Sequence, residues 1–242
     1  MLDVHSHILP GVDDGAKTVD DSLKLLEQMQ NEGVTTAAAT VHFYTESAVL
    51  EDFLAERENA LKKLINLIGE DYPVKILPGA EVLYFGGIGR FAGIKELTIG
   101  KSKYLLLELL GLKKIDDKVI NDIISIKEEL GLIPIIAHIE RYCKYRGYKK
   151  LLSAVAENKI LCQINATFPG KGPEYRAVKK LLTAGLISFV ASDCHCPATR
   201  PVKLNEAYKK LRQISPEETD KIIKKTEAFE KELIEAYEKS NG

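Results

Sequence analysis

The sequence lacks the features that mark several large classes of protein. Its 242 residues include only four cysteines, too few and too scattered for a disulfide framework, so we expect reduced thiols. No apolar run approaches the ~20 residues that a membrane span needs, and no signal-peptide pattern follows Met1. The net charge of −1 gives no general attraction to nucleic acid or to an anionic membrane. These absences predict a cytoplasmic protein that neither binds nucleic acid nor inserts into a membrane.

Glycine-rich nucleotide-binding motifs are also absent. Neither G-x-G-x-x-G nor G-x-x-x-x-G-K-[ST] follows any apolar run. Short apolar runs instead alternate with longer, charged, periodic stretches, and near-continuous apolar runs are typical of parallel strands covered on both faces. The predicted strands are Leu2–His7, Thr35–Val41, Val74–Val82, Tyr104–Leu109, Ile133–His138, Ile160–Ile164 and Ile187–Ala191.

The charged stretches have the three- and four-residue apolar spacing of amphipathic helices. Thr18 is a suitable N-cap for the first helix, which Gly33 ends. The other predicted helices are Ser47–Ile68, Asp117–Leu130, Lys149–Asn158, Glu174–Ala184, Lys203–Ile214 and Pro216–Ser240. Seven strands that each feed a helix favour a parallel α/β barrel over an open sheet. No linker divides the chain, so we predict that residues 1–242 form a single domain.

All five histidines occupy the same kind of position. His5 and His7 share one face of the first predicted strand, because strand side chains alternate with period two. Such a pair can be the first two ligands of a metal site, or it can be two partly buried histidines with a structural role. His42, His138 and His195 also lie at the end of a predicted strand or directly after it, which is the active-site face of a parallel barrel. Structural histidines would also occur on helices, and none does, so the distribution favours a metal site.

Carboxylates occur at the same strand ends. Glu81 and Glu108 lie within apolar runs, where an acid is unfavourable unless a cation or a metal balances it. Asp193 precedes His195 by two residues and repeats the spacing of the first histidine pair. After the first strand comes the acidic turn Asp13-Asp14-Gly15, in which Asp13 can form an Asx turn while Asp14 reaches a metal.

The number and type of these donors limit how many metal ions the site can hold and which metals they are. About nine nitrogen and oxygen donors are too many for one ion and suit two or three. A mixture of imidazole and carboxylate favours Mn, Fe or Zn over Ca. Bridged ions roughly 3.5–4 Å apart activate water and stabilise a phosphoryl group during in-line displacement. Arg141 and Arg200, close to His138 and His195 in the chain, are suited to bind phosphate oxygens, or else are surface salt-bridge partners, Arg141 with Glu140.

With these residues in place, the chain resembles the PHP (polymerase and histidinol phosphatase) superfamily. Within it, the chain is similar to the bacterial CpsB/CapC/YwqE-type metal-dependent tyrosine-protein phosphatases of capsule and exopolysaccharide loci. The resemblance spans residues 3 to 201 in the family's order. The matching stretches are D-V-H-S-H-I-L-P-G-V-D-D-G-A-K-T, A-T-V-H, G-A-E-V, L-L-L-E-L, P-I-I-A-H-I-E-R-Y and S-D-C-H-C-P-A-T-R-P.

The resemblance implies a distorted (β/α)7 TIM-like barrel with a trinuclear site, manganese being favoured over iron or zinc. By resemblance, one ion would be bound by His5, His7, Glu81 and Asp193, a second by Glu81, Glu108 and His138, and a third by Asp14, His42 and His195. Two stretches depart from the family pattern. Val41 and Phe43 replace the proline and second histidine of A-T-P-H-H, and Ile139 replaces the proline of H-P-E-R-Y. These changes affect loop geometry and substrate contacts and remove no ligand.

The resulting hypothesis is a phosphomonoesterase that hydrolyses phosphotyrosine in proteins by in-line attack of a metal-bound hydroxide. Arg141 and Arg200 would hold the phosphoryl oxygens, and Asp14 or His42 could assist proton transfer. Family resemblance suggests that the substrate is an autophosphorylating bacterial tyrosine kinase. Three alternatives remain: a phosphatase for histidinol phosphate or another small ester, a cysteine phosphatase that uses the C-x5-R stretch from Cys194 to Arg200, and a non-catalytic metal-binding scaffold.

Overall fold

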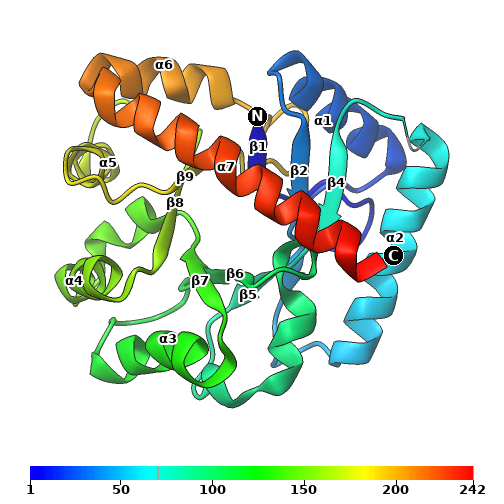
Figure 1. The fold of residues 1–242 in the computed structure, drawn as a ribbon. Coiled ribbons are helices and arrows are strands. Elements are labelled where there is room, and N and C mark those ends of the chain that lie inside the picture. The colour runs from blue at the N-terminus through cyan, green and yellow to red at the C-terminus, as the bar shows by residue number, and fades with distance from the viewer. Residues whose placement is uncertain (70, 242) are drawn as a thin grey trace.

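The computed structural model describes residues 1–69 and 71–241, and its centre is a curled parallel sheet surrounded by helices (Figure 1). The strands are β1 (Leu2–Ser6), β2 (Thr36–Ala39), β3 (His42–Phe43), β4 (Lys75–Pro78), β5 (Glu81–Leu83), β6 (Tyr104–Glu108), β7 (Ile133–Ile136), β8 (Leu161–Asn165) and β9 (Phe189–Ala191). The α-helices are α1 (Val19–Asn31), α2 (Leu50–Ile68), α3 (Asp117–Leu130), α4 (Tyr148–Asn158), α5 (Pro173–Thr183), α6 (Leu204–Ile214) and α7 (Pro216–Asn241).

These elements agree closely with the sequence predictions. Every predicted helix, and every predicted strand except Val74–Val82, is present with ends shifted by a few residues, and Thr18 caps α1 through a reciprocal pair of hydrogen bonds with Asp21. One prediction was wrong. The connection from β5 to β6 contains only the short 3₁₀ helices η1 (Ile88–Arg90), η2 (Ala92–Leu97) and η3 (Ile99–Lys101), so this strand does not feed an α-helix.

The pairing of the strands explains the curl of the sheet. One hydrogen-bonded sheet has the order β1-β2-β4 and the other β3-β5-β6-β7-β8-β9. Within each sheet, neighbouring strands are parallel. The predicted strand Val74–Val82 is interrupted at Gly79 and Ala80. The buried side chain of Arg57 binds the Gly79 carbonyl at 3.3 Å, which satisfies an acceptor that the interrupted sheet leaves open. Beyond the break, His42 pairs directly with Glu81.

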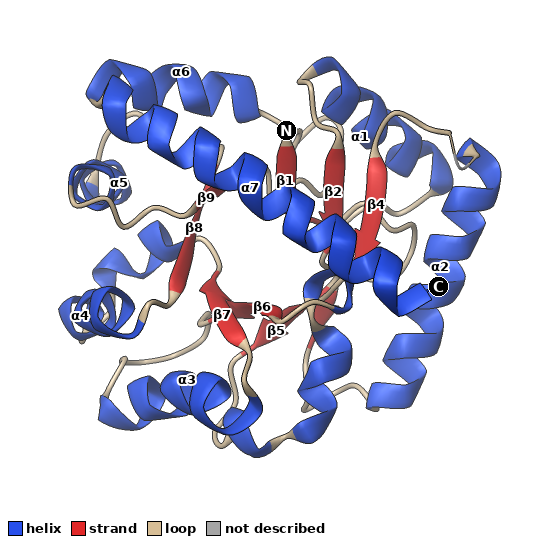
Figure 2. Ribbon diagram, viewed as in Figure 1, coloured by secondary structure: helices blue, strands red, loops and turns tan. Residues whose placement is uncertain are grey.

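The two ends of the strand series lie side by side. The backbone N–H of His7 donates to the Cys194 carbonyl and that of Asp193 donates to the His5 carbonyl, both at 2.9 Å. The Asp3 carboxylate adds a bond by accepting the Ser192 N–H at 3.0 Å. As a result, the strands surround a common interior, with the helices outside (Figure 2).

The interior is apolar and closed where the strands begin. Tyr104 and Phe189, the first residues of β6 and β9, contact Phe229 of α7 with ring centroids 4.2 and 4.6 Å apart. Leu233, one turn further along α7, is fully buried in the same cluster. In Figure 1, α7 (red) crosses this end of the sheet. Polar groups are therefore confined to the opposite end, where the strands finish.

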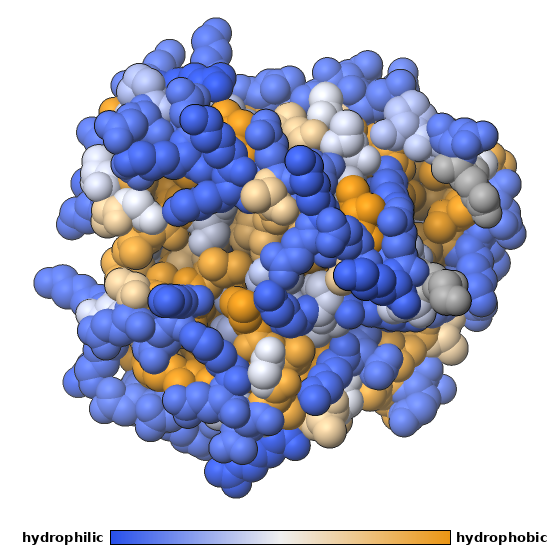
Figure 3. Space-filling view, in the orientation of Figure 1, coloured by the Kyte–Doolittle hydropathy of each residue, from blue (hydrophilic) through white to orange (hydrophobic). Residues whose placement is uncertain are grey.

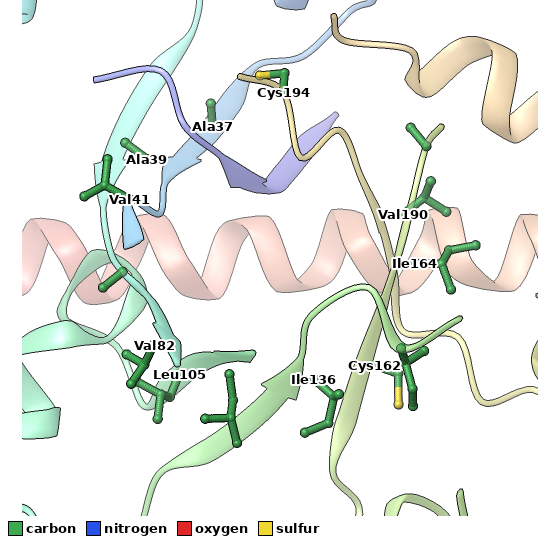
Figure 4. Packing of buried hydrophobic residues seen from close by; sticks show 14 of the residues in the cluster. Ala37, Ala39, Val41, Val82, Leu105, Ile136, Cys162, Ile164, Val190 and Cys194 are labelled. Carbon is green, nitrogen blue, oxygen red and sulfur yellow. The ribbon is translucent and has the colours of Figure 1, made fainter. Parts of the chain in front are cut away.

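A second apolar layer lies between the strands and the surrounding helices. Ala37, Val82, Ile136 and Val190 belong to it, and Figure 4 shows them around the outside of the ring of strands. Successive strand residues alternate between this layer and the interior, since strand side chains point to opposite faces. Residues of both layers are almost completely buried, which matches the near-continuous apolar runs of the sequence.

A stability prediction follows from the turn before α4. Gly147 has φ +93°, and a Cβ there would lie 1.8 Å from the Ile115 carbonyl oxygen, whereas Gly131 has φ +70° with no atom within 4 Å. We expect Gly131→Ala to lower the free energy of unfolding by about 1–2 kcal/mol, the strain of a left-handed residue. Gly147→Ala should cost at least ~2 kcal/mol more, because backbone must move. Urea unfolding followed by circular dichroism measures both, and equal losses would contradict the clash.

Candidate metal centre

The ends of the strands bring all nine predicted ligands together. They surround a pocket of about 380 Å³, with Arg141 and Arg200 also in its wall. His5 and His7 are fully buried beneath this pocket. The side chains that line it directly are Asp14, His42, Glu81, Glu108, His138, Asp193 and His195. The sequence prediction that these residues share one face of the molecule is confirmed by their positions, while their roles as ligands remain a prediction.

Alternation along single strands explains why the polar groups gather at this end. In β6, Tyr104 and Leu106 belong to the apolar interior, and Glu108 is the next residue on that face. In β8, Leu161 is followed on the same face by Gln163 and Asn165. The interior therefore changes from apolar to polar along the direction of the strands.

The carboxylate of Glu81 lies at the centre of the cluster. Its Oε2 atom is 3.1 Å from His5 Nε2, 3.3 Å from His7 Nε2 and 3.2 Å from His42 Nδ1. Its Oε1 atom is 2.9 Å from His138 Nε2. The residue is 1% exposed. A carboxylate in this position would be able to help hold a cation.

The remaining acids extend the cluster in two directions. Glu108 Oε1 is 3.3 Å from His138 Nε2, and Glu108 Oε2 is 3.9 Å from His42 Nδ1. Asp14 Oδ1 lies 3.4 Å from the Nε2 atoms of both His42 and His195. Asp14 is the most exposed of the nine, with 64% of its side chain accessible, because it comes from the loop after β1.

Three groups of donor atoms are compact enough to hold one ion each, with all atoms of a group within 4.8 Å of one another. They are His5, His7 and Glu81; His42, Glu81 and Glu108; and His7, Asp14, His42 and His195. The grouping differs from the predicted sets: His42 belongs to the second group as well as the third, His7 belongs also to the third, and His138 and Asp193 lie outside all three groups. Asp193 approaches the first group, with Oδ1 3.5 and 3.6 Å from the Nε2 atoms of His5 and His7.

In four of the five histidines, the Nδ1 atom lies within hydrogen-bond distance of a protein oxygen. The partners of the Nδ1 atoms are Gln163 Oε1 for His5 (3.2 Å), Asp13 Oδ2 for His7 (2.7 Å), Tyr142 Oη for His138 (3.1 Å) and the Asp193 carbonyl for His195 (3.0 Å). An Nδ1–H that donates to these oxygens leaves the Nε2 lone pair directed into the cluster. This arrangement is typical of metal-binding histidines, whose outer nitrogen fixes the tautomer and the ring orientation.

Several of these supporting residues were missed in the sequence. Gln163 also accepts the backbone N–H of His138 at 2.7 Å, and Asn165 Nδ2 donates to Asp193 Oδ2 at 2.6 Å. The available signal was a polar pair at alternate positions of an otherwise apolar strand. Buried amides at such positions need partners, which points to a polar interior.

Asp13 has two roles where the sequence predicted one. Its Oδ1 atom accepts the Gly15 N–H at 2.8 Å, which is the expected Asx turn. Its Oδ2 atom accepts from the backbone N–H of His42 at 3.0 Å as well as from His7. A Cβ on Gly15 would lie 2.3 Å from the His7 carbonyl oxygen, so only glycine allows this loop to fold against the histidine.

Asp193 joins the cluster to the two arginines. Its Oδ2 atom accepts from Arg141 Nη2 at 2.9 Å and from Arg200 Nη2 at 2.8 Å, while Oδ1 faces the histidines. Arg141 thus pairs with Asp193 and not with Glu140. The side chains of Arg141 and Arg200 are 34% and 40% exposed, and both line the pocket. Each has further N–H donors available for an anion.

The backbone is strained at two site residues. His138 and Asp193 have φ values of +32° and +51°, in the left-handed region that residues other than glycine rarely adopt. Each lies two residues after the end of a strand, β7 or β9, at the start of a segment that carries an arginine. Strain of this kind is common at functional sites, where it aims a side chain.

Electrostatic coupling sets the protonation of the cluster. Burial alone would raise the pKa of Glu81, but the surrounding histidines hold it well below its usual value. Burial opposes the charging of His7 and His138, yet Asp13 and Glu81 raise the pKa of His7 to about 10, and Glu108 and Glu81 raise that of His138 to about 9. The pKa of His195 falls to about 4 through burial and the nearby His7. In the metal-free protein, protons on His7 and His138 thus occupy positions where cations would bind.

The donors fit a metal better than they fit a hydrogen-bonded core. The Nε2 atoms of His5 and His7 are only 3.0 Å apart, the separation expected of two imidazoles that share one ion with bonds of ~2.1 Å. His42 Nδ1 and His195 Nε2 are buried without any hydrogen-bond partner. Orphaned buried nitrogens are unfavourable, so each indicates a missing cation or water. Cys194, by contrast, is fully buried and burial raises its pKa, which removes the basis for a cysteine nucleophile.

Known proteins are similar to this chain in sequence. Tyrosine-protein phosphatase CpsB of Streptococcus agalactiae serotype III is 32% identical over 224 residues, which cover 86% of this chain and 88% of that protein. Tyrosine-protein phosphatase YwqE of Bacillus subtilis is 32% identical over 213 residues, with 86% and 82% covered. Residues 1–229 match the family model for capsular polysaccharide synthesis, CpsB/CapC.

Solved structures with a similar fold include relatives from the same family. Crystal structures of YwqE from Bacillus subtilis and CpsB from Streptococcus pneumoniae, described as unique metal-dependent tyrosine phosphatases, match with a TM-score of 0.73 and 30% identity over 88% of this chain and 87% of the other. Histidinol phosphate phosphatase from Lactococcus lactis shares the fold, with a TM-score of 0.55 and 13% identity over 88% and 93%. On this evidence the chain belongs to the CpsB/CapC family of capsular polysaccharide synthesis proteins.

Proposed function

We propose that this protein is a metal-dependent phosphomonoesterase that hydrolyses phosphotyrosine in proteins of capsule or exopolysaccharide synthesis. One observation carries the proposal: a cluster of nine imidazole and carboxylate donors lies directly under two arginines that a single carboxylate oxygen holds in place. Relatives at 30–32% identity that are named tyrosine-protein phosphatases support the substrate.

Two or three divalent transition ions would be held by the nine side chains, manganese by preference and iron or zinc otherwise. The first would use His5, His7, Glu81 and Asp193, the second Glu81, Glu108 and His138, and the third Asp14, His42 and His195. Bound ions would supply Lewis acidity, which lowers the pKa of a water nucleophile and neutralises charge on the phosphoryl group.

The protein's own groups bind and orient the phosphoryl group. Asp193 fixes one Nη2 atom of Arg141 and of Arg200, so their remaining N–H groups are presented to phosphoryl oxygens with little loss of side-chain freedom. Asp14 and His42 both line the pocket, and one of them could hold a proton near the leaving oxygen only where it does not bind the third ion. A phenolate leaving group is stable enough to need little protonation, which suits a site without a dedicated buried acid.

An apolar wall beside the cluster suits an aromatic ester. Tyr44 stacks on His42 with ring centroids 5.1 Å apart, and Leu83 and Leu110 line the same pocket. Tyr44 and Leu110 are 37% and 44% exposed, and thus available to pack against the ring of phosphotyrosine. Histidinol phosphate, with its charged amine, would gain less from this wall.

The partner and the setting follow from the proposed activity. The protein substrate would be a bacterial tyrosine kinase that phosphorylates itself, and the enzyme would act in the cytoplasm, where its four free cysteines stay reduced. Among the described residues, no helix combines the length and the apolar character needed to span a membrane.

We also infer that the nine short strands form seven strands of a distorted (β/α)7 barrel within one domain of residues 1–242. The support is that β2 and β3 are separated by only two residues, as are β4 and β5. Each pair can thus be a single barrel strand with an interruption. The backbone bonds between β1 and the segment after β9 supply a closing seam.

The metal requirement can be tested with His5→Ala and with chelation. Among the described residues, the His5 ring has one printed hydrogen-bond partner outside the cluster, Gln163, and His5→Ala keeps the backbone bonds of His5, so we expect the variant to fold. We expect both treatments to lower the rate on a phosphotyrosine peptide on the order of 100-fold or more. Cys194→Ala is the control and should stay active with unchanged metal content. Activity that survives both chelation and His5→Ala would refute the metal mechanism.

Metal uptake should release protons. His7 and His138, with pKa values of about 10 and 9, are protonated at pH 7.5 in the metal-free protein and must lose these protons to bind ions. Apparent affinity for Mn²⁺ should therefore rise with pH from 6 to 8 and level off only above the two pKa values. Calorimetry in two buffers of different ionisation enthalpy measures the release. Affinity that does not change over this range would contradict the assigned protonation.

The apolar wall gives a test of substrate class. Tyr44→Ala combined with Leu110→Ala should raise the KM for an aryl phosphate roughly fivefold to tenfold, because an aromatic contact and a leucine contact are lost. The rate on histidinol phosphate or an alkyl phosphate should change little. Leu67→Ala, at a leucine 58% exposed on α2, is the matched control. Equal effects on both substrate types would show that the wall does not select the ester.

A further inference from the structure

A second and larger cavity lies beside the metal centre, between the helices α4 and α5. This α4–α5 groove has a volume of about 680 Å³ and is lined by Tyr145, Tyr148, Lys149, Lys150, Arg176 and Lys180, among others. On the face that Figure 3 shows, which α7 crosses, hydrophobic residues are visible between α5 and α4 with hydrophilic residues on both sides. The proposed reaction does not use this groove.

The charge of the groove is positive in a chain that is almost neutral. Four of its lining residues are cationic and none is acidic, although the whole chain has a net charge of −1. Lys150 pairs with Asp117 at 2.7 Å. Among the residues that the structure describes, Lys149, Arg176 and Lys180 have no carboxylate within 4.0 Å. Glu174, which follows the groove residue Pro173 in the chain, is paired with Lys144 at 3.3 Å.

The groove and the metal centre share a wall. The 3₁₀ helix η4 (Ile139–Lys144) carries Arg141 into the pocket and Cys143 into the groove. The Tyr142 ring lies 5.7 Å from that of His138 and 5.4 Å from that of Tyr145, a groove residue. Tyr142 is fully buried, so these ring contacts run through the interior, but Arg141 and Cys143 are two residues apart on η4, roughly 4 Å along the axis of a 3₁₀ helix. A peptide bound in the pocket can thus reach the groove.

We propose that the α4–α5 groove binds an acidic segment of the protein substrate, rich in Asp and Glu, that lies a few residues from the phosphotyrosine. The inference rests on the proposed phosphatase function and adds the feature by which a protein substrate is distinguished from a small ester. Unpaired Lys149, Arg176 and Lys180 attract the carboxylates, and the tyrosines and the apolar floor take up the backbone and apolar side chains between them.

The test uses the full-length, metal-loaded protein and three substrates at fixed ionic strength. They are 4-nitrophenyl phosphate, a phosphotyrosine peptide with Asp and Glu three to five residues away on either side, and the same peptide with Asn and Gln. The native protein should have a kcat/KM at least tenfold higher for one acidic peptide than for the neutral one, with less difference at high salt. In Lys149→Glu combined with Arg176→Glu this preference should vanish through KM, while 4-nitrophenyl phosphate is hydrolysed normally.

Lys224→Glu combined with Lys225→Glu is the matched control. It makes the same charge change on the exposed side of α7, at the closed end of the sheet, and should keep the preference. Binding of a labelled, unphosphorylated acidic peptide, measured by fluorescence anisotropy, reports on the groove without turnover. If Lys149→Glu with Arg176→Glu lowers stability, Lys149→Gln with Arg176→Gln replaces it.

Two results would overturn the proposal. One is the absence of any preference for an acidic peptide in the native protein. The other is a groove variant that changes the oligomeric state, which would make the groove an interface between copies of this chain. Inactivity of the native protein on all three substrates, with acidic-peptide binding retained, would instead refute the phosphatase function and leave the groove assigned.

Discussion

A carboxylate buried among four imidazoles is the constraint on which the rest of the site depends. Glu81 is 1% exposed and lies within 3.3 Å of His5, His7, His42 and His138. A charge in such a place is tolerated only if cations balance it, either protons on the rings or metal ions. The high pKa values of His7 and His138 describe the first solution, and the orphaned nitrogens of His42 and His195 indicate that protons alone do not complete it. The rings need fixed orientations in either case, which explains the bonds from Asp13, Gln163 and Tyr142 behind them.

The fold supplies this constraint through a division of its interior. Phe229 and Leu233 of α7 seal the end where the strands begin, so that end can be wholly apolar. The other end can then be polar without exposing the core to water. Interruptions such as that at Gly79 turn the last residues of a strand toward the cluster, and His42 and Glu81 become direct neighbours. Function and stability are thus separated along the strands, as is general for parallel barrels.

Much of this could be predicted from the sequence, for identifiable reasons. Apolar runs and helical periodicity are local properties, so the strands and helices were predicted to within a few residues. The five histidines all lay at the end of a predicted strand or directly after it, and parallel strands end at one edge, so their convergence was predictable. The interruption at Gly79 and the 3₁₀ connection before β6 were not, because they depend on distant partners such as Arg57. The same holds for Gln163 and Asn165 and for the pairing of both arginines with Asp193, which are contacts between segments far apart in the chain.

The α4–α5 groove lies outside the metal centre and could not be recognised from the sequence. Its cations come from two helices whose sequences read as ordinary solvated faces, and only their packing against η4 places them on one wall. The central claim nevertheless concerns the metals. The most direct measurement is the number of ions bound per chain after loading with manganese, in the native protein and in Glu81→Gln, together with the rate on a phosphotyrosine peptide. The account predicts two or three ions and activity for the native protein, and the loss of at least one ion and of activity for Glu81→Gln. A native protein that is active with no bound ion would contradict it.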